Sequence, residues 1–215
     1  MRSPFFPQLV RRAEYSVKQN GRYYEYGHYK QEIREDCLGR CVYCDSHENE
    51  VGGVECMEMD HFRPKKYPVH EHLVNDPRNL VWACRGCNRL KTSTWPALGL
   101  DVLIVNGEGF IDPFVDRLSD YFEIKADGEL VPLKPAAHYL VTILALNRVS
   151  KRRIREMRLF AIMFTNEVDD KIQKMERILS GELSAEQRDD GKKVLEWLLH
   201  MKRDIISRLL DFNLL

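Results

Sequence analysis

Six cysteines occur in the 215 residues, and four of them form two Cys-x-x-Cys pairs, "CVYC" and "CRGC". Two residues between thiolates let both sulfurs of one turn bind the same tetrahedral zinc ion, and a second pair completes the four ligands. The sequence therefore predicts a structural zinc site, with no open coordination position, formed by Cys41, Cys44, Cys84 and Cys87. Cys37 and Cys56 have no partner at this spacing, so we expect a small buried side chain and a loop thiol.

Thiol–disulfide chemistry is the alternative role for the two pairs. A redox-active Cys-x-x-Cys motif normally follows a strand and opens a helix within a βαβ unit. This alternative requires at least one pair to be free of metal and to titrate as a reactive dithiol.

Between the two pairs lie Asp60-His61 and Asn79, and Asn88 directly follows the last cysteine. A carboxylate, an imidazole and a carboxamide are the groups that one hard cation and one general base need. An anionic phosphodiester with a poor leaving group is a substrate that requires such a cation. Adjacent strand residues face opposite ways, so Asp60 and His61 can serve one site only if the strand ends or bulges there. Glu58, two residues before Asp60, lies on the same face of the strand, and we expect its side chain to face solvent.

The order Cys-x-x-Cys, Asp-His, Asn, Cys-x-x-Cys-Asn across residues 37–95 resembles the HNH nuclease motif. In that family two antiparallel strands and a helix, the ββα-metal unit, hold one divalent cation over the scissile phosphate. The resemblance implies that His61 is the general base and that Asp60 and Asn88 hold a catalytic Mg²⁺ or Mn²⁺ ion. It also implies that Asn79 fixes the loop between the strands, and that the products carry a 5′-phosphate and a 3′-hydroxyl. Asn88 replaces the more frequent histidine, and its harder oxygen suits Mg²⁺.

Basic residues accompany the motif and predict contacts with nucleic-acid phosphates. The candidates are Arg63, Lys65, Arg85, Arg89 and Lys91 near the motif, and Arg152 and Arg153 in a later basic cluster. An ordinary solvated surface is the alternative for each of them. Lys and Arg total 33 and Asp and Glu total 33, a balance that excludes a protein coating nucleic acid by net charge alone.

Softer motifs are similar to a narrower group, the HNH proteins of bacterial defence operons. The segments "DHFRPK", "NLVWACRGCNRLKTSTWP", "FIDPF" and "TILALNR" resemble the nuclease subunit of Septu-type systems and a retron-associated relative. This resemblance implies phage or plasmid DNA as substrate and an ABC- or SMC-like ATPase as partner.

The elements that must position these residues are short, apart from the C-terminal helices. We expect a helix near 31–38, then short strands and one short helix over 36–95. Asp127-Gly128 between alternating segments predicts a hairpin. Two long antiparallel helices should occupy residues 151–212, the first ending at Ser180-Gly181 and the second opening with a Ser184–Gln187 capping box. Its apolar stripe comprises Val194, Leu195, Leu198, Leu199, Ile205, Ile206, Leu209 and Leu210.

The sequence thus predicts an α+β fold: a zinc-stabilised ββα-metal nuclease unit, then a β-hairpin and a mainly helical C-terminal region. The expected parts are an N-terminal extension (1–36), the HNH unit (37–95), a strand and loop connector (96–135) and the helical region (136–215). No segment resembles a signal peptide or a membrane span, which favours a cytoplasmic protein with no membrane partner. A non-catalytic zinc-ribbon module that binds nucleic acid or protein is the alternative function. Duplex DNA, single strands and RNA all stay open as substrates.

Overall fold

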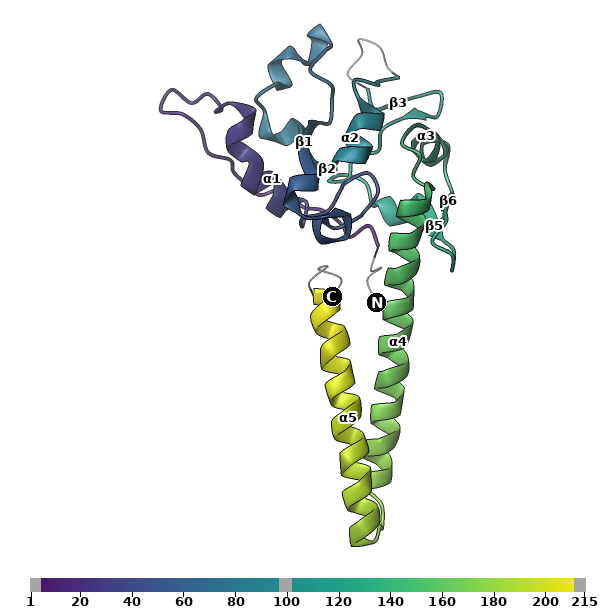
Figure 1. The fold of residues 1–215 in the computed structure, drawn as a ribbon. Coiled ribbons are helices and arrows are strands. Elements are labelled where there is room, and N and C mark those ends of the chain that lie inside the picture. Colours follow the sequence, from purple (N-terminus) through teal and green to yellow (C-terminus); the bar gives the residue numbers. More distant parts are fainter. Residues whose placement is uncertain (1–4, 97–101, 211–215) are drawn as a thin grey trace. The chain divides into compact units, whose positions relative to one another are not determined.

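The computed structural model describes residues 5–96 and 102–210 and confirms an α+β fold of helices and small antiparallel sheets (Figure 1). The helices are α1 (Lys30–Asp36), α2 (Arg85–Lys91), α3 (Pro135–Ile143), α4 (Val149–Leu179) and α5 (Ala185–Leu210). The strands are β1 (Met57–His61), β2 (Leu80–Cys84), β3 (Ile104–Val105), β4 (Glu108–Gly109), β5 (Phe122–Ile124) and β6 (Leu130–Pro132). The chain divides into two compact units, Met1–Ile154 and Arg155–Leu215. The four-part division from the sequence stays a prediction.

The first unit contains the expected two strands and helix. β1 and β2 pair antiparallel, with Met57 opposite Cys84 and His61 opposite Leu80. β2 reads "LVWAC" and is buried at every position, as a continuous apolar run predicts for a core strand. α2 begins directly after β2, so Cys84 ends the strand and Cys87 lies in the first turn of the helix. β1 ends at His61. The strand has to end or bulge here if Asp60 and His61 are to serve one site.

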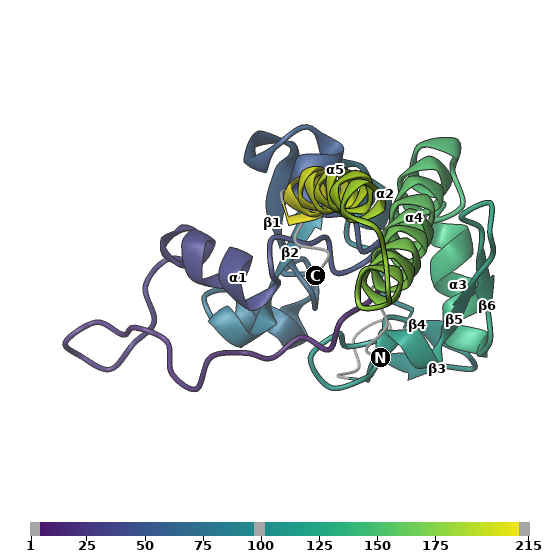
Figure 2. The same ribbon diagram turned by 90° about the horizontal axis from the view of Figure 1, so that it is seen from below.

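The predicted hairpin forms from β5 and β6, and Asp127-Gly128 lies in its loop. Gly128 has φ 77°, in the left-handed region that glycine enters without a steric cost. Figure 2 shows β5, β6 and α3 on the far side of this unit from α1, with the β1–β2 pair between them. The fold therefore places the HNH segment at the centre of the first unit.

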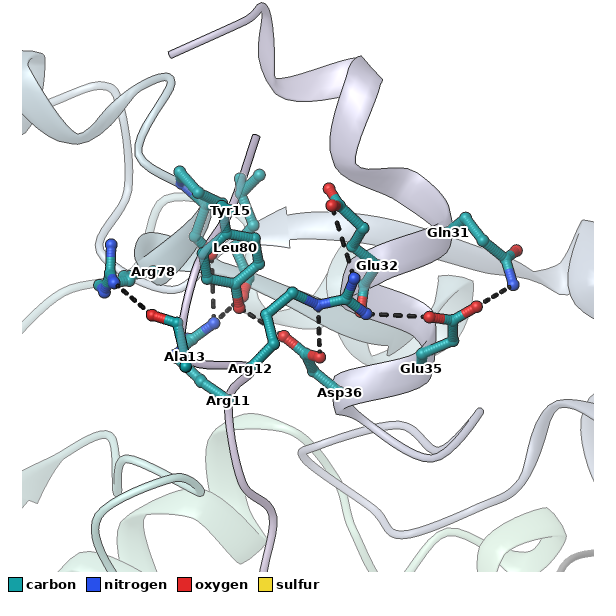
Figure 3. Close-up of polar contacts among 11 residues, drawn as sticks. Arg11, Arg12, Ala13, Tyr15, Gln31, Glu32, Glu35, Asp36, Arg78 and Leu80 are labelled. Carbon is teal, nitrogen blue, oxygen red and sulfur yellow. Dashed lines mark hydrogen bonds and ion pairs between the residues drawn. The ribbon is translucent and has the colours of Figure 1, made fainter. Parts of the chain in front are cut away.

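The N-terminal segment is tied to the HNH segment by charged side chains (Figure 3). Arg12 pairs with Glu35 and Asp36 of α1, both at 2.9 Å. Arg11 Nη1 donates to the carbonyl oxygens of Pro77 and Leu80, each at 3.1 Å, where β2 begins. Arg12 thus holds α1 against the start of the extension, and Arg11 ties the extension to the start of β2, roles that the sequence did not indicate.

Tyr15 should make the stability of the first unit sensitive to alkaline pH. Burial, reinforced by a hydrogen bond from its hydroxyl to Asp36, raises the pKa of Tyr15 to about 12. Between the ordinary value near 10 and this value, the unfolded chain loses the tyrosine proton while the folded chain keeps it. The free energy of unfolding should therefore fall as pH rises from 10 to 12, with a Tyr15 share on the order of 1 kcal/mol per pH unit.

Urea unfolding followed at several pH values tests this expectation. Tyr15→Phe should have a shallower loss of stability above pH 10 than the wild type, and the same pH dependence between pH 7 and 9. Equal slopes for the two proteins above pH 10 would show that Tyr15 does not carry the effect.

The second unit is built on α4 and α5, which run antiparallel as predicted (Figure 1). The capping box is confirmed, because Ser184 N donates to Gln187 Oε1 and Gln187 N donates to Ser184 Oγ. Val168 and Ile172 pack against Leu198, with Leu195, Met201 and Ile205 beside them.

The predicted apolar stripe of α5 is only partly right. Val194 and Leu199 are exposed, because the face that meets α4 is narrower than the stripe. The side chains of Ile206, Leu209 and Leu210 lie outside the described residues. Over residues 5–96 and 102–210, none of the helices is long and apolar enough to span a bilayer.

Candidate active site and metal centre

The two Cys-x-x-Cys pairs meet in one cluster. The sulfur atoms of Cys41, Cys44, Cys84 and Cys87 all lie within 4.8 Å of one another, and all four residues are buried. Cys44 Sγ and Cys84 Sγ are 3.8 Å apart. Four sulfurs bound to one zinc ion at about 2.3 Å are separated by about 3.8 Å at the corners of a tetrahedron. The cluster therefore fits a single zinc ion.

The other two cysteines lie outside this cluster. Cys37 is fully buried and accepts a hydrogen bond from Trp82 N at 3.4 Å, and Cys56 is half-buried. Burial raises the pKa of Cys37 to about 12, which keeps this thiol protonated. Both positions agree with the expected non-ligand roles.

Two cations from the start of α4 contact the cysteine cluster. Arg148 Nη2 lies 3.3 Å from Cys87 Sγ. Lys151 Nζ lies 3.0 Å from Ser46 Oγ, which is itself 3.4 Å from Cys44 Sγ. Burial by itself would lower the pKa of Lys151, but the thiolate charges, led by that of Cys44, outweigh burial and raise it. Both cations lie next to Arg152 and Arg153 in the sequence, and nothing in that stretch indicated a contact with the cysteines.

Polar side chains of β1 and α2 contact one another. Glu58 and Asp60 share one face of β1, and both reach α2. Asn88 Nδ2 donates to Glu58 at 2.7 Å, and Arg85 Nε donates to the same carboxylate at 3.1 Å. The expectation that Glu58 faces solvent is partly right, because its side chain is 36% exposed while its carboxylate also reaches α2. Glu58 lies two residues before Asp60, so the alternation of side chains along a strand could have placed both on the same face.

Asp60 is held by two buried donors. Tyr43 donates its hydroxyl hydrogen to Asp60 Oδ2 at 2.6 Å, and Lys91 Nζ lies 2.9 Å from the same oxygen. Burial, with the Asp60 charge, raises the pKa of Tyr43 and keeps it a donor. Burial lowers the pKa of Lys91, and the Asp60 carboxylate opposes this shift. Both contacts use Oδ2.

The His61 ring contacts the loop that follows β1 and a tyrosine of the N-terminal extension. Its Nε2 lies 2.9 Å from the carbonyl oxygen of Val74, and its ring packs edge-on against Tyr26 at a centroid distance of 5.0 Å. Within the described residues, the ring makes no hydrogen bond to Asp60 or Asn88. A carbonyl can only accept, so Nε2 carries the hydrogen and Nδ1 keeps its lone pair. Burial lowers the pKa of His61 against the opposing Val74 hydrogen bond, so the ring is neutral near pH 7.

Asn79 ties the loop between the strands at both ends. Its Oδ1 accepts from Arg63 N at 2.9 Å, while its Nδ2 donates to Arg63 O at 3.0 Å and Leu73 O at 3.4 Å. The loop from Phe62 to Asn79 carries Val74, whose carbonyl oxygen orients His61. The role that the sequence resemblance implies for Asn79 stays a prediction.

Asn79→Ala should destabilise the first unit by about 2–3 kcal/mol, because it removes these hydrogen bonds from a buried position and leaves backbone groups unpaired. Urea unfolding followed by tryptophan fluorescence measures the loss. Asn75→Ala is the matched control, since Asn75 accepts one hydrogen bond, from Tyr26 N, in the same loop and should cost less than about 1 kcal/mol. Equal losses for the two variants would contradict the assigned role of Asn79.

The basic candidates occupy different environments. Lys65, Arg89 and Arg153 are exposed, whereas Lys91 is fully buried against Asp60 and differs from the expected surface contact. Arg85 is exposed but pairs with Glu58, and Arg152 pairs with Asp127 of the hairpin loop. The backbone N–H and carbonyl of Arg63 bond to Asn79. Lys91 lies three residues after Asn88, so helical periodicity could have placed it on the buried face of α2.

Residues 41–94, which include both Cys-x-x-Cys pairs, β1, β2 and α2, match the family model described as HNH endonuclease. No curated protein and no solved structure matches the chain. The chain therefore has an HNH domain within an α+β fold, followed by a helical C-terminal region. The HNH domain suggests a nuclease, and HNH nucleases use a divalent metal.

Proposed function

We propose that this protein is a metal-dependent endonuclease that hydrolyses phosphodiester bonds of DNA. His61 is the general base, and Asp60 and Asn88 hold one Mg²⁺ or Mn²⁺ ion. The observation that supports this proposal best is the match of residues 41–94, which contain β1, β2 and α2, to the HNH endonuclease model.

The donor atoms around this face fit a hard divalent cation. Asp60 and Glu58 supply carboxylate oxygens, and Asn88, which donates through Nδ2 to Glu58, has its carbonyl oxygen available. Oxygen ligands of this kind favour Mg²⁺ or Mn²⁺ over softer metals. When bound, such an ion neutralises charge that develops on the phosphate and stabilises the leaving oxygen. Tyr43 and Lys91 keep the carboxylate in place.

His61 has the protonation state that a general base needs. Val74 O fixes the tautomer, so the lone pair on Nδ1 is the proton acceptor. Its lowered pKa keeps the ring neutral at cellular pH. Tyr26 packs against the His61 ring and helps to hold it in place.

The exposed cations Lys65, Arg89 and Arg153 are the proposed phosphate contacts. Contacts of this kind position a backbone without reading its sequence. Cleavage without strong sequence preference, weakening as salt is raised, is the expected behaviour.

A plasmid cleavage assay with the purified chain tests the activity. We expect nicked or linear product with Mg²⁺ or Mn²⁺, no product in EDTA, and ends that carry a 5′-phosphate and a 3′-hydroxyl. Single-stranded DNA and RNA of the same length, assayed in parallel, identify the preferred substrate. Absence of cleavage for every substrate and metal, in a protein that contains zinc and is folded, would contradict the nuclease proposal.

A non-catalytic zinc module is the second candidate. It is favoured by the Lys91 ammonium, which already pairs with Asp60 where the catalytic cation would need that carboxylate. This candidate predicts nucleic-acid or protein binding that persists in EDTA at concentrations that spare the zinc, with no cleavage.

A role in bacterial defence with an ABC- or SMC-like ATPase stays a prediction from the softer motifs. Co-expression with an ATPase encoded beside the gene, followed by co-purification and a DNA cleavage assay, tests it. Failure of the two proteins to associate would count against that role without affecting the nuclease proposal.

A further inference from the structure

The start of α4 brings two cations to the cysteine cluster from far along the sequence. Arg148 donates to Cys87 Sγ at 3.3 Å, and Lys151 reaches Cys44 through Ser46 Oγ. Gly86, inside the second Cys-x-x-Cys pair, makes room for the guanidinium, because a Cβ there would lie 3.2 Å from Arg148 Nη2. Three side chains from two segments thus lie beside the sulfur atoms: Ser46 after the first Cys-x-x-Cys pair, and Arg148 and Lys151 at the start of α4.

The positive charges of Arg148 and Lys151 offset the negative charge of a zinc–thiolate centre. A zinc ion with four thiolates carries two excess negative charges. The four cysteines are at most 3% exposed, so water cannot screen this charge. Buried charge is costly unless it is paired and hydrogen-bonded. Lys151 is itself only 4% exposed, so its buried ammonium also requires a nearby negative charge, which the thiolates supply.

The two cations that directly follow Lys151 have other surroundings. Arg153 is exposed, and Arg152 pairs with Asp127, away from the cysteines. Lys151 is too deeply buried to contact a phosphate, whereas the exposed side chain of Arg153 can reach one. Within residues 148–153, two cations are therefore directed at the metal centre, one pairs with Asp127 and one is exposed.

We propose that Arg148 and Lys151 are the charge-compensating partners of the tetrathiolate zinc centre, and that through them the metal and the start of α4 stabilise each other. This proposal rests on the zinc assignment and not on nuclease activity. It makes zinc retention depend on residues outside the segment that matches the HNH family.

Zinc release tests the proposal. The full chain is mixed with excess chelator, and released zinc is followed with a colorimetric indicator for the wild type, Lys151→Met, Arg148→Met and the matched control Arg153→Met. Loss of an outer-shell partner typically weakens metal binding by about 10–100-fold. We expect release from Lys151→Met and Arg148→Met to be faster by about tenfold or more, and release from Arg153→Met to stay within about twofold of the wild type.

A conservative variant and a spectroscopic signal separate charge compensation from general structural damage. Lys151→Arg keeps the charge and should release zinc within about threefold of the wild type, even if Lys151→Met folds poorly. In the cobalt-substituted protein, removing a positive charge beside sulfur raises the energy of the sulfur electrons. The thiolate-to-cobalt absorption band should therefore move to longer wavelength in Arg148→Met and not in Arg153→Met.

Two results would overturn the proposal. One is folded Lys151→Met and Arg148→Met protein with wild-type release rates and an unshifted cobalt band. The other is Lys151→Arg releasing zinc as fast as Lys151→Met. A folded wild type purified without stoichiometric zinc would instead overturn the zinc assignment itself, and this proposal with it.

Discussion

His61→Ala should lower the rate of DNA cleavage by about 10²–10⁴-fold or below detection, because a positioned general base contributes that much to a hydrolysis. Zinc content and the midpoint of thermal unfolding should change little, since the metal cluster lies elsewhere and the ring makes one hydrogen bond, to Val74 O. Initial rates of plasmid nicking at saturating Mn²⁺, measured beside zinc analysis and melting curves, provide the comparison.

His72→Ala is the matched control for this variant. His72 is an exposed histidine of the same loop, so the His72→Ala protein should cleave DNA at the wild-type rate. A His61→Ala protein that is folded, contains zinc and cuts at the wild-type rate would remove His61 from the mechanism.

Loss of the metal centre should have the largest effect on stability. Apparent binding free energies of structural zinc are about 10–16 kcal/mol, as large as the whole stability of a typical domain. Cys44→Ala should therefore lose zinc and leave the first unit unfolded at room temperature. Trp82 and Trp95 are buried in this unit, so their fluorescence should shift to longer wavelength, while the exposed Trp197 contributes a constant background.

Cys56→Ala controls for the loss of a thiol, because Cys56 lies outside the cluster. It should keep stoichiometric zinc and a wild-type emission spectrum. If Cys44→Ala protein kept both zinc and buried tryptophans, the four-cysteine metal centre would be wrong.

Local patterns predicted most of what lies within a short stretch of chain. The two-residue spacing predicted that each cysteine pair shares one site, and Asp127-Gly128 predicted the hairpin. Ser184 with Gln187 predicted the start of α5. Each of these depends on neighbours a few residues apart, whose geometry the backbone largely determines. The zinc cluster needed one further step, the pairing of β2 with β1.

Contacts between distant residues were beyond reach of the sequence. Tyr43 reaches Asp60, and Arg148 reaches Cys87, only because the fold brings separate segments together. Tyrosine and arginine occur on most surfaces, so their residue type gives no warning of such a role. Lys91 shows the converse, because its basic character suggested a phosphate contact while its position on α2 buried it beside Asp60.

The catalytic cation is the claim on which the nuclease proposal depends most. Diffraction from crystals of the full chain grown with Mn²⁺, measured at the manganese absorption edge, would locate it directly. The expected result is one anomalous peak bonded to oxygen atoms of Asp60 and Asn88, in addition to zinc at the four cysteines. A map with zinc at the cysteines, Lys91 still paired with Asp60 and no manganese between β1 and α2 would contradict the proposed active site.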